Sequence, residues 1–142
     1  MAPMKKVLIL CTGNSARSQM AEGLLRHEAG DRFEVSSAGT EPTEVRPEAI
    51  AVMQELGIDI SHHRSKSVDE FLDRKFDYVI TVCDNARESC PVFPGTARYV
   101  HWSLEDPARA RGPENERRLV FRRIRDEIAG RLKSFAAGEN PE

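Results

Sequence analysis

Short apolar runs alternate along the chain with stretches in which apolar residues recur every three or four positions. The runs are rich in β-branched residues and predict four buried strands, at residues 5–10, 33–37, 77–82 and 98–102. The other stretches predict helices at residues 16–29, 47–57 and 114–135, with a short helix at 68–75. Residues 83–97 are polar and carry two prolines, so we expect a surface loop or a short frayed helix there.

This alternation predicts an α/β fold, with a four-stranded parallel sheet, helices on both faces and right-handed crossovers. A chain of 142 residues suits a single catalytic domain spanning 1–142, with its core at about residues 5–135. Ligands of such sheets bind beyond the carboxyl ends of the strands. Cys11 and Cys83 directly follow the first and third strands, and Asp106 lies just past the fourth. We therefore expect these three residues to meet at one edge of the sheet.

Composition and charge exclude several classes of function. The chain carries 21 Lys and Arg against 23 Asp and Glu, and this balance gives no indication of nucleic-acid binding. The apolar runs, residues 7–10 among them, are far shorter than the ~20 residues of a membrane span. No signal-peptide core follows Lys5 and Lys6, so we expect a cytoplasmic protein without a membrane partner. The arginines of the last helix are expected to form a solvated face; they are Arg117, Arg118, Arg122, Arg123 and Arg125.

The loop between the first strand and the first helix has the residues of an oxyanion site. It consists of Cys11, Thr12, Gly13, Asn14, Ser15, Ala16, Arg17 and Ser18. Backbone amides at a helix N-terminus favour anions, and the guanidinium of Arg17 suits two-pronged contact with a tetrahedral oxyanion. Gly13 and Asn14 are residue types that adopt left-handed backbone conformations easily.

In that electrostatic field the Cys11 thiol is expected to ionise well below its free pKa of ~8.5, with the Ser18 hydroxyl donating to the thiolate. The loop thus predicts nucleophilic attack on, or by way of, a tetrahedral oxyanion. The alternative is a buried structural cysteine, with Arg17 an ordinary surface residue of the helix.

The cysteines and histidines give no metal-site pattern. Three cysteines form no closed disulfide framework, and the spacing of Cys83 and Cys90 is not that of a zinc knuckle. We expect His62, His63 and His101 to serve in packing or at the surface. The sequence therefore predicts neither a metal site nor a cofactor.

Four segments together resemble the thioredoxin-coupled arsenate reductases, which share the fold of the low-molecular-weight protein tyrosine phosphatases. The segments read CTGNSARSQMAE, SSAGT, VCDNARESCP and HWSLEDPA, and the resemblance covers residues 5–135. It implies that Cys11 attacks arsenate held by the loop and Arg17, and that Cys83 then attacks Cys11 and releases arsenite. It further implies that Cys90 moves the disulfide outward to Cys83–Cys90, where thioredoxin reduces it.

The resemblance also implies a role for Asp106. Proline at 107 restricts the residue before it to extended conformations and so partly fixes the direction of the carboxylate. The expected role is to protonate the leaving oxygen and then to help deprotonate the next thiol. The alternative is an ordinary loop aspartate before proline.

Two positions depart from the family pattern. Ala16 stands where the family loop often has a second cysteine, which is not part of the relay. Some members bind potassium through positions matching Asn14, Glu22, Ser37 and an aspartate, and Lys66 stands at the aspartate position here. Because a lysine ammonium can replace the cation, we expect no potassium dependence.

Two other functions stay open on the sequence: a low-molecular-weight protein tyrosine phosphatase, and a non-enzymatic anion-binding or redox-sensing module. For the reductase, phosphate and sulfate are the expected competing oxyanions, and a monomer is expected. Cys90 favours thioredoxin over glutaredoxin or a small thiol as the electron donor, by resemblance.

Overall fold

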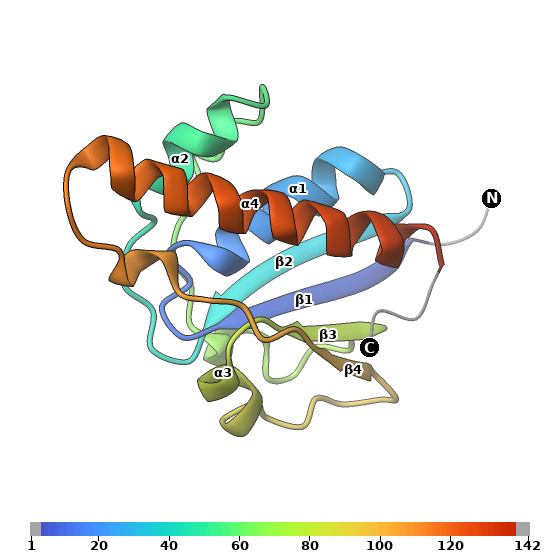
Figure 1. Cartoon of the computed structure of the whole chain (residues 1–142). Coiled ribbons are helices and arrows are strands. Elements are labelled where there is room, and N and C mark those ends of the chain that lie inside the picture. Colours follow the sequence, from blue (N-terminus) through green and yellow to red (C-terminus); the bar gives the residue numbers. More distant parts are fainter. Residues whose placement is uncertain (1–3, 139–142) are drawn as a thin grey trace.

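A computed structural model describes residues 4–138 of the chain. The four strands are β1 (Lys5–Cys11), β2 (Phe33–Gly39), β3 (Tyr78–Thr81) and β4 (Arg98–His101). They form one sheet in the order β2-β1-β3-β4, and all three pairings are parallel (Figure 1). The predicted parallel sheet is confirmed, with strand ends that differ by a residue or two from those expected.

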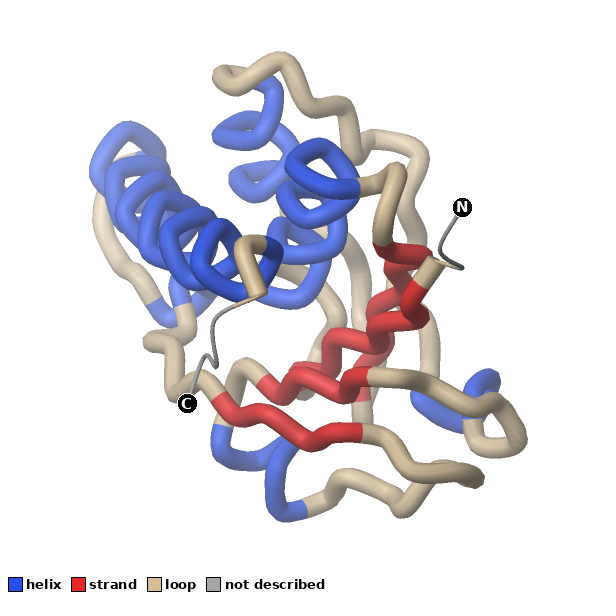
Figure 2. The backbone as a smooth tube through the Cα atoms, turned by 90° about the vertical axis from the view of Figure 1, so that its right-hand side faces the viewer, coloured by secondary structure: helices blue, strands red, loops and turns tan. Residues whose placement is uncertain are grey.

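The helices cover the two faces of the sheet unequally. The four α-helices are α1 (Arg17–Ala29), α2 (Pro47–Gln54), α3 (Asp84–Glu88) and α4 (Glu114–Ala136), and two 3-10 turns are η1 (Val68–Phe71) and η2 (Pro107–Arg109). Helices α1 and α4 pack on one face with α2 beside them, whereas the short η1 and α3 lie on the other (Figure 2). The sequence predicts a surface loop or a short helix for the segment from 83 to 97, and this segment contains the short helix α3.

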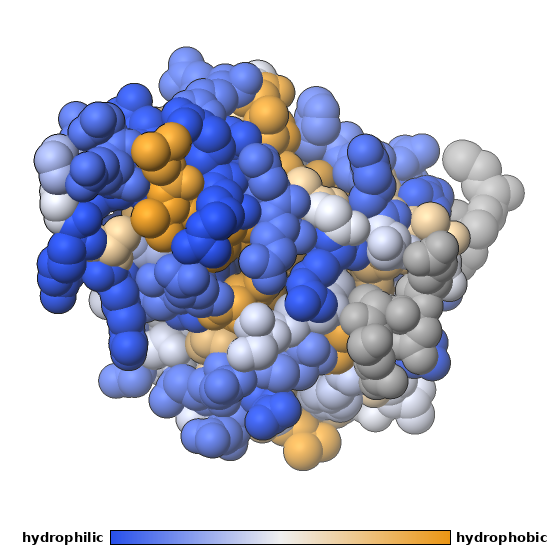
Figure 3. Space-filling model, viewed as in Figure 1, coloured by the Kyte–Doolittle hydropathy of each residue, from blue (hydrophilic) through white to orange (hydrophobic). Residues whose placement is uncertain are grey.

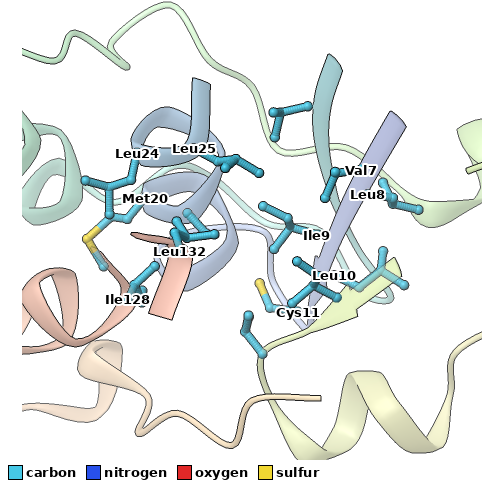
Figure 4. Packing of buried hydrophobic residues seen from close by; sticks show 14 of the residues in the cluster. Val7, Leu8, Ile9, Leu10, Cys11, Met20, Leu24, Leu25, Ile128 and Leu132 are labelled. Carbon is cyan, nitrogen blue, oxygen red and sulfur yellow. The ribbon is translucent and has the colours of Figure 1, made fainter. Parts of the chain in front are cut away.

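Strand β1 lies at the centre of the core because its residues are apolar on both faces. The side chains of residues 7–10 are fully buried. Met20 and Leu24 from α1 and Ile128 and Leu132 from α4 lie together on one side of β1 (Figure 4). Burying each such side chain contributes roughly 1.5–3 kcal/mol relative to leaving it exposed. This packing fixes the direction of β1 and so the position of Cys11 at its end.

The opposite face is closed by an aromatic cluster. The ring of Phe76 lies 6.1 Å from that of Phe71 in η1 and 5.5 Å from that of Phe93, which follows α3 (centroid distances). All three side chains are buried. The cluster anchors the chain on both sides of the segment that carries Cys83 and Cys90.

The surface is mostly polar. Side chains of polar residues cover most of the face seen in Figure 3, with smaller apolar areas between them. Within residues 4–138, every helix is too short or too polar to cross a bilayer.

The interpretation of the α4 arginines as a solvated face is wrong for Arg125. This residue is only 6% exposed. Its guanidinium donates to the Val52 carbonyl at 2.7 Å and to the Glu55 carboxylate at 2.8 Å. Because Glu55 lies at the end of α2, 70 residues away in sequence, no local pattern on α4 reveals this partner.

Replacing Glu55 with glutamine is expected to lower the free energy of unfolding at neutral pH. Hydrogen bonds from Arg122 lower the pKa of this carboxyl from 4.5 to about 2, assisted by Arg125. A pKa depressed by folding stabilises the protein above the unfolded value, and that stabilisation is lost as pH falls from 4.5 towards 2. With 35% of the side chain exposed, we expect about 1 kcal/mol, well below the full linkage value.

Urea unfolding of the wild type and Glu55→Gln at pH 7 and pH 3 measures this contribution. The stability difference should shrink by more than half at pH 3. A difference that stays constant between the two pH values would show that the carboxylate charge is not its source.

Candidate active site

The carboxyl ends of the strands open into one cleft of about 1000 Å³. Cys11 at the end of β1, Cys83 just past β3 and Asp106 beyond β4 all line it, together with Arg17. The convergence expected from the strand pattern is thus observed. Cys90 does not line this cleft.

The Cys11 sulfur lies in a network of short contacts at the floor of the cleft. Its Sγ is 2.8 Å from the Ser18 Oγ and accepts the Asn14 backbone N–H at 3.1 Å. The cysteine is only 2% exposed. The expected contact with Ser18 is therefore present.

The prediction of a low pKa for Cys11 is wrong in direction. Burial raises the pKa of the Cys11 thiol, although the Ser18 hydrogen bond and the positive charge of Arg17 both act to lower it. Desolvation of the charged form outweighs these favourable contacts. How deep the sulfur lies depends on packing over the whole fold, which the loop motif alone does not convey.

Asn14 organises the loop. It has a φ of 50°, in the left-handed region, as expected, whereas Gly13 does not have a positive φ. The Asn14 side chain donates to Ser18 at 2.7 Å and to Ser37 at 3.0 Å, and its oxygen accepts the backbone N–H of Lys66 at 2.9 Å. These bonds fix the loop to β2 and to the segment before η1.

Two residues that hold the loop were not predicted from the sequence. Gln19, which is fully buried, donates to the Asn14 side chain at 2.9 Å and to its backbone oxygen at 3.2 Å. Gly39 lies so close to Thr12 that an added Cβ would clash with the Thr12 carbonyl oxygen. In the sequence, Gln19 is visible only as a polar residue directly after the loop motif, and Gly39 only as the glycine that ends β2. Neither feature predicts which residue it contacts.

Arg17 is held at the rim of the loop with its guanidinium in the cleft. It donates to the Leu104 carbonyl at 3.0 Å, and its Nη2 lies 3.7 Å from the Asp106 carboxylate. The Arg17 side chain is 10% exposed and that of Asp106 is 32% exposed. Because α1 begins at Arg17, the positive end of its dipole also faces the loop. Guanidinium, helix end and loop amides together suit a tetrahedral dianion.

Asp106 is fixed by its own backbone turn. One carboxylate oxygen accepts the Ala108 N–H at 3.0 Å, so that Asp106 caps η2, which begins at Pro107. The other oxygen faces Arg17 at 3.7 Å. The structure thus places the carboxylate beside the oxyanion loop, as the sequence predicts.

Cys83 lies beside the loop, at the start of α3. Its Sγ is 3.2 Å from the Thr12 Oγ1 and accepts the Ala86 N–H at 3.4 Å, which makes it the N-cap of α3. The residue is 6% exposed. It is near enough to Cys11 that its charge adds, as the smallest contribution, to the rise in the pKa of the Cys11 thiol.

Cys90 lies beyond the other end of α3. It is half-buried in a separate cavity of about 340 Å³, with Val92 and Tyr99 among its lining residues. Burial raises the pKa of its thiol. In this structure all three cysteines are free, and Cys90 is the one that lies away from the main cleft.

Lys66 occupies the place that the sequence predicts for it. Its Nζ lies 3.8 Å from the Glu22 carboxylate and donates to the Arg64 carbonyl at 3.1 Å. Burial opposes ionisation of Glu22, but the Ser37 hydroxyl and the Lys66 and His63 side chains together hold its pKa below the ordinary value. The ammonium therefore balances a buried carboxylate behind the loop.

His62, His63 and His101 all make contacts within the fold. The His63 Nδ1 lies 2.9 Å from the Gln19 Oε1, behind the loop. The His101 ring joins the end of β3 to α3 through Thr81 and Asp84. His62 stacks edge-on against His63.

A parallel sheet with a cysteine–arginine oxyanion loop at its edge defines a class of cysteine-nucleophile enzymes of the phosphatase type. The model of the low molecular weight phosphotyrosine protein phosphatase family matches residues 6–140, and the chain belongs to this family.

Relatives within this family are named as arsenate reductases. One from Halalkalibacterium halodurans is 48% identical over 132 residues, covering 93% of this chain and 95% of its own. A solved structure of an arsenate reductase in the phosphate binding state has a TM-score of 0.76 at 35% identity, with 96% of this chain and 100% of that chain covered. A thioredoxin-dependent arsenate reductase from Corynebacterium glutamicum has a TM-score of 0.73 at 33% identity, with 96% and 62% covered.

Proposed function

We propose that this protein reduces arsenate to arsenite through a relay of its three cysteines, and that thioredoxin restores the dithiol. The observation that carries the proposal is the placement of Cys11 and Cys83 in one cleft with Arg17, while Cys90 lies outside it beyond α3. A phosphatase needs only the first of the three cysteines. The two further thiols, Cys83 and Cys90, allow a disulfide formed at Cys11 to be transferred away from the oxyanion loop.

The first step joins sulfur to arsenic. The loop amides and Arg17 hold the arsenate dianion, and Cys11 attacks the arsenic. Burial raises the pKa of the Cys11 thiol, and the step balances when the thiol proton passes to an arsenate hydroxyl, which leaves as water. Asp106, beside Arg17, relays that proton at the leaving oxygen.

The second step transfers the electrons. The Cys83 sulfur attacks the Cys11 sulfur, a disulfide forms, and the sulfur–arsenic bond breaks with its electron pair kept by arsenic. The proton of the Cys83 thiol passes to an oxygen of the departing arsenite. Arsenic passes from the pentavalent to the trivalent state and leaves as arsenite, while the two cysteines are oxidised together. The Thr12 hydroxyl, 3.2 Å from Cys83, steadies the attacking sulfur.

The last steps move the disulfide outward. Cys90 attacks Cys83, Cys11 leaves as a thiolate, and thioredoxin reduces the Cys83–Cys90 disulfide by thiol exchange. Since this chemistry needs a reducing compartment and one chain builds the whole cleft, we propose a cytoplasmic monomer.

The direct test is an assay with arsenate, thioredoxin, thioredoxin reductase and NADPH, in which arsenite release and NADPH oxidation are followed together. One molecule of arsenite released for each NADPH oxidised supports the proposal. NADPH oxidation that is independent of arsenate, or no turnover at all, contradicts it and favours a redox-sensing module.

The family match favours one second function, the hydrolysis of phosphate esters at the same loop. A double variant with Cys83→Ser and Cys90→Ser separates the two activities. It should lose arsenate reduction and keep any hydrolysis of p-nitrophenyl phosphate. A phosphatase without reductase activity would release phosphate at full rate in both proteins and release no arsenite.

Turnover is expected to be equal in potassium and sodium salts. The Lys66 ammonium and the Arg26 guanidinium lie 3.8 and 2.7 Å from the two oxygens of the Glu22 carboxylate, so a bound cation has no negative charge left to neutralise there. Steady-state arsenate reduction in the two salts at one ionic strength measures this. Clear activation by potassium would contradict the assignment.

A variant extends this test. Lys66→Ala should lower activity in sodium and recover part of it in potassium, since Glu22 Oε1 then lacks its ammonium partner and only Oε2 keeps a cation, Arg26. Lys133→Ala, which removes an exposed lysine near the end of α4, is the matched control and should change neither value.

A further inference from the structure

Helix α3 separates the two cysteines that must pair in the last step of the relay. Cys83 caps the start of α3, and Cys90 follows its end by two residues. Seven residues of helix span about 10 Å along the axis. A disulfide requires Cα atoms within about 7 Å of each other. For Cys90 to reach Cys83, α3 must therefore lose at least part of its helical structure.

The helix is too short to be stable by itself. It has 5 residues, and isolated helices of this length do not persist in water. Its hold on the fold comes from side chains, among them the fully buried Ala86. Its first residue, Asp84, makes the 2.9 Å polar contact that joins α3 to the end of β4.

Asp84 is bound to the end of β4. Its Oδ1 lies 2.9 Å from the His101 Nε2 and accepts the Ser103 hydroxyl at 3.4 Å. Because a carboxylate only accepts hydrogen bonds, Nε2 carries the hydrogen. The hydrogen bond from His101 also holds the pKa of Asp84 below its ordinary value.

The imidazole is itself fixed to the sheet. The His101 Nδ1 lies 2.7 Å from the Thr81 Oγ1, and these two residues are partners in the register of β3 and β4. The His101 side chain is 17% exposed and that of Asp84 is 64% exposed. The histidine is thus the rigid member of the pair and the aspartate the member that can move with α3.

The Asp84–His101 contact also lies between the main cleft, which holds Cys83, and the separate cavity of Cys90. Asp84 lines the main cleft with Cys11 and Cys83, whereas His101 lines the separate cavity of Cys90. Any unwinding of α3 from its first turn displaces Asp84 and so breaks its contact with His101.

We infer that the Asp84–His101 contact is a latch that holds α3 folded and thereby limits the transfer of oxidation from Cys83 to Cys90. The inference rests on the proposed relay. Both are positioning residues, since neither takes part in bond exchange. In the limited step the Cys90 thiolate attacks the Cys83 sulfur, the Cys83–Cys90 bond forms, and Cys11 leaves as a thiolate with the electron pair of the broken disulfide. The proton of Cys90 goes to solvent.

The test measures each disulfide as it forms. Reduced full-length protein is mixed with arsenate, quenched with acid, alkylated and mapped by mass spectrometry. Asp84→Ala should convert the Cys11–Cys83 disulfide to Cys83–Cys90 about threefold faster, the size expected for losing one hydrogen bond to a partly exposed carboxylate. The rate at which the Cys11–Cys83 disulfide forms should stay the same. A general destabilisation of the fold would change that rate as well.

Three further variants define the source of the effect. Asp84→Asn keeps an acceptor for His101 and should restore most of the wild-type rate. Glu88→Ala removes an exposed carboxylate from the last residue of α3 and should change nothing. His101→Gln should accelerate transfer like Asp84→Ala, and combining the two should add little. Additive effects, or an unchanged rate in Asp84→Ala, overturn the latch.

A second measurement requires no arsenate. In a Cys11→Ser background, the Cys83–Cys90 disulfide is equilibrated with a glutathione redox buffer. Asp84→Ala should raise the equilibrium constant for forming the Cys83–Cys90 disulfide about threefold. The reason is that oxidation no longer has to break the Asp84–His101 contact that stabilises α3. An unchanged constant overturns the latch. If arsenate yields no Cys11–Cys83 disulfide in the wild type while this shift is present, the proposed function fails and the latch stands.

Discussion

Replacing Cys90 with serine is expected to abolish multiple turnover while leaving one reduction of arsenate per molecule intact. The reason is that Cys11 and Cys83 line the cleft together and suffice for arsenite release, whereas Cys90 lies in its own cavity. After one event the oxidation should stay as a Cys11–Cys83 disulfide buried from thioredoxin. Quantifying arsenite against enzyme should give a burst of one equivalent and then background turnover.

Two variants bracket this result. Cys83→Ser should release no arsenite in the burst, because the sulfur–arsenic bond formed by Cys11 then has no attacking thiol. Ser89→Ala, next to Cys90, should turn over like the wild type. Sustained turnover by Cys90→Ser with thioredoxin would show that the reductant reaches the buried disulfide directly, and would remove Cys90 from the relay.

The sequence predicts the scaffold and the meeting of the site residues well, for a physical reason. Parallel strands buried on both faces are continuous apolar runs, and residues that follow such runs must emerge at one edge of the sheet. Cys11, Cys83 and Asp106 could therefore be placed together without any knowledge of side-chain contacts. The relay itself was implied by the resemblance, not by the spacing.

What the sequence does not predict depends on distant packing. The pKa of Cys11 is decided by how deeply the sulfur is buried, and the exclusion of Arg125 from solvent is decided by Glu55 on another helix. Gly39 matters only because β2 brings it against the Thr12 carbonyl. In each case the deciding partner is far away along the chain, and local periodicity does not encode it.

Replacing Arg17 with lysine is expected to lower kcat/KM for arsenate by about a hundredfold, the usual effect of losing one preorganised donor to a developing oxyanion. The charge is kept, but the planar pair of donors that suits a tetrahedral oxyanion is lost. The lysine also cannot hold both the Leu104 carbonyl and the Asp106 carboxylate, which Arg17 contacts at 3.0 and 3.7 Å. Steady-state kinetics over a range of arsenate concentrations measure the loss.

Arg109→Lys is the matched control. Arg109 lies 4.0 Å from the same Asp106 carboxylate, but its side chain is 88% exposed at the rim of the cleft. Because solvent screens that contact, kcat/KM should change by less than about twofold. If both substitutions lower kcat/KM by the same factor, Arg17 contributes only its positive charge, and the proposed two-pronged contact of its guanidinium with the oxyanion is wrong. A large loss confined to Arg17→Lys requires that the donor geometry at the end of the loop, and not net charge around the cleft, stabilises the attack on arsenic.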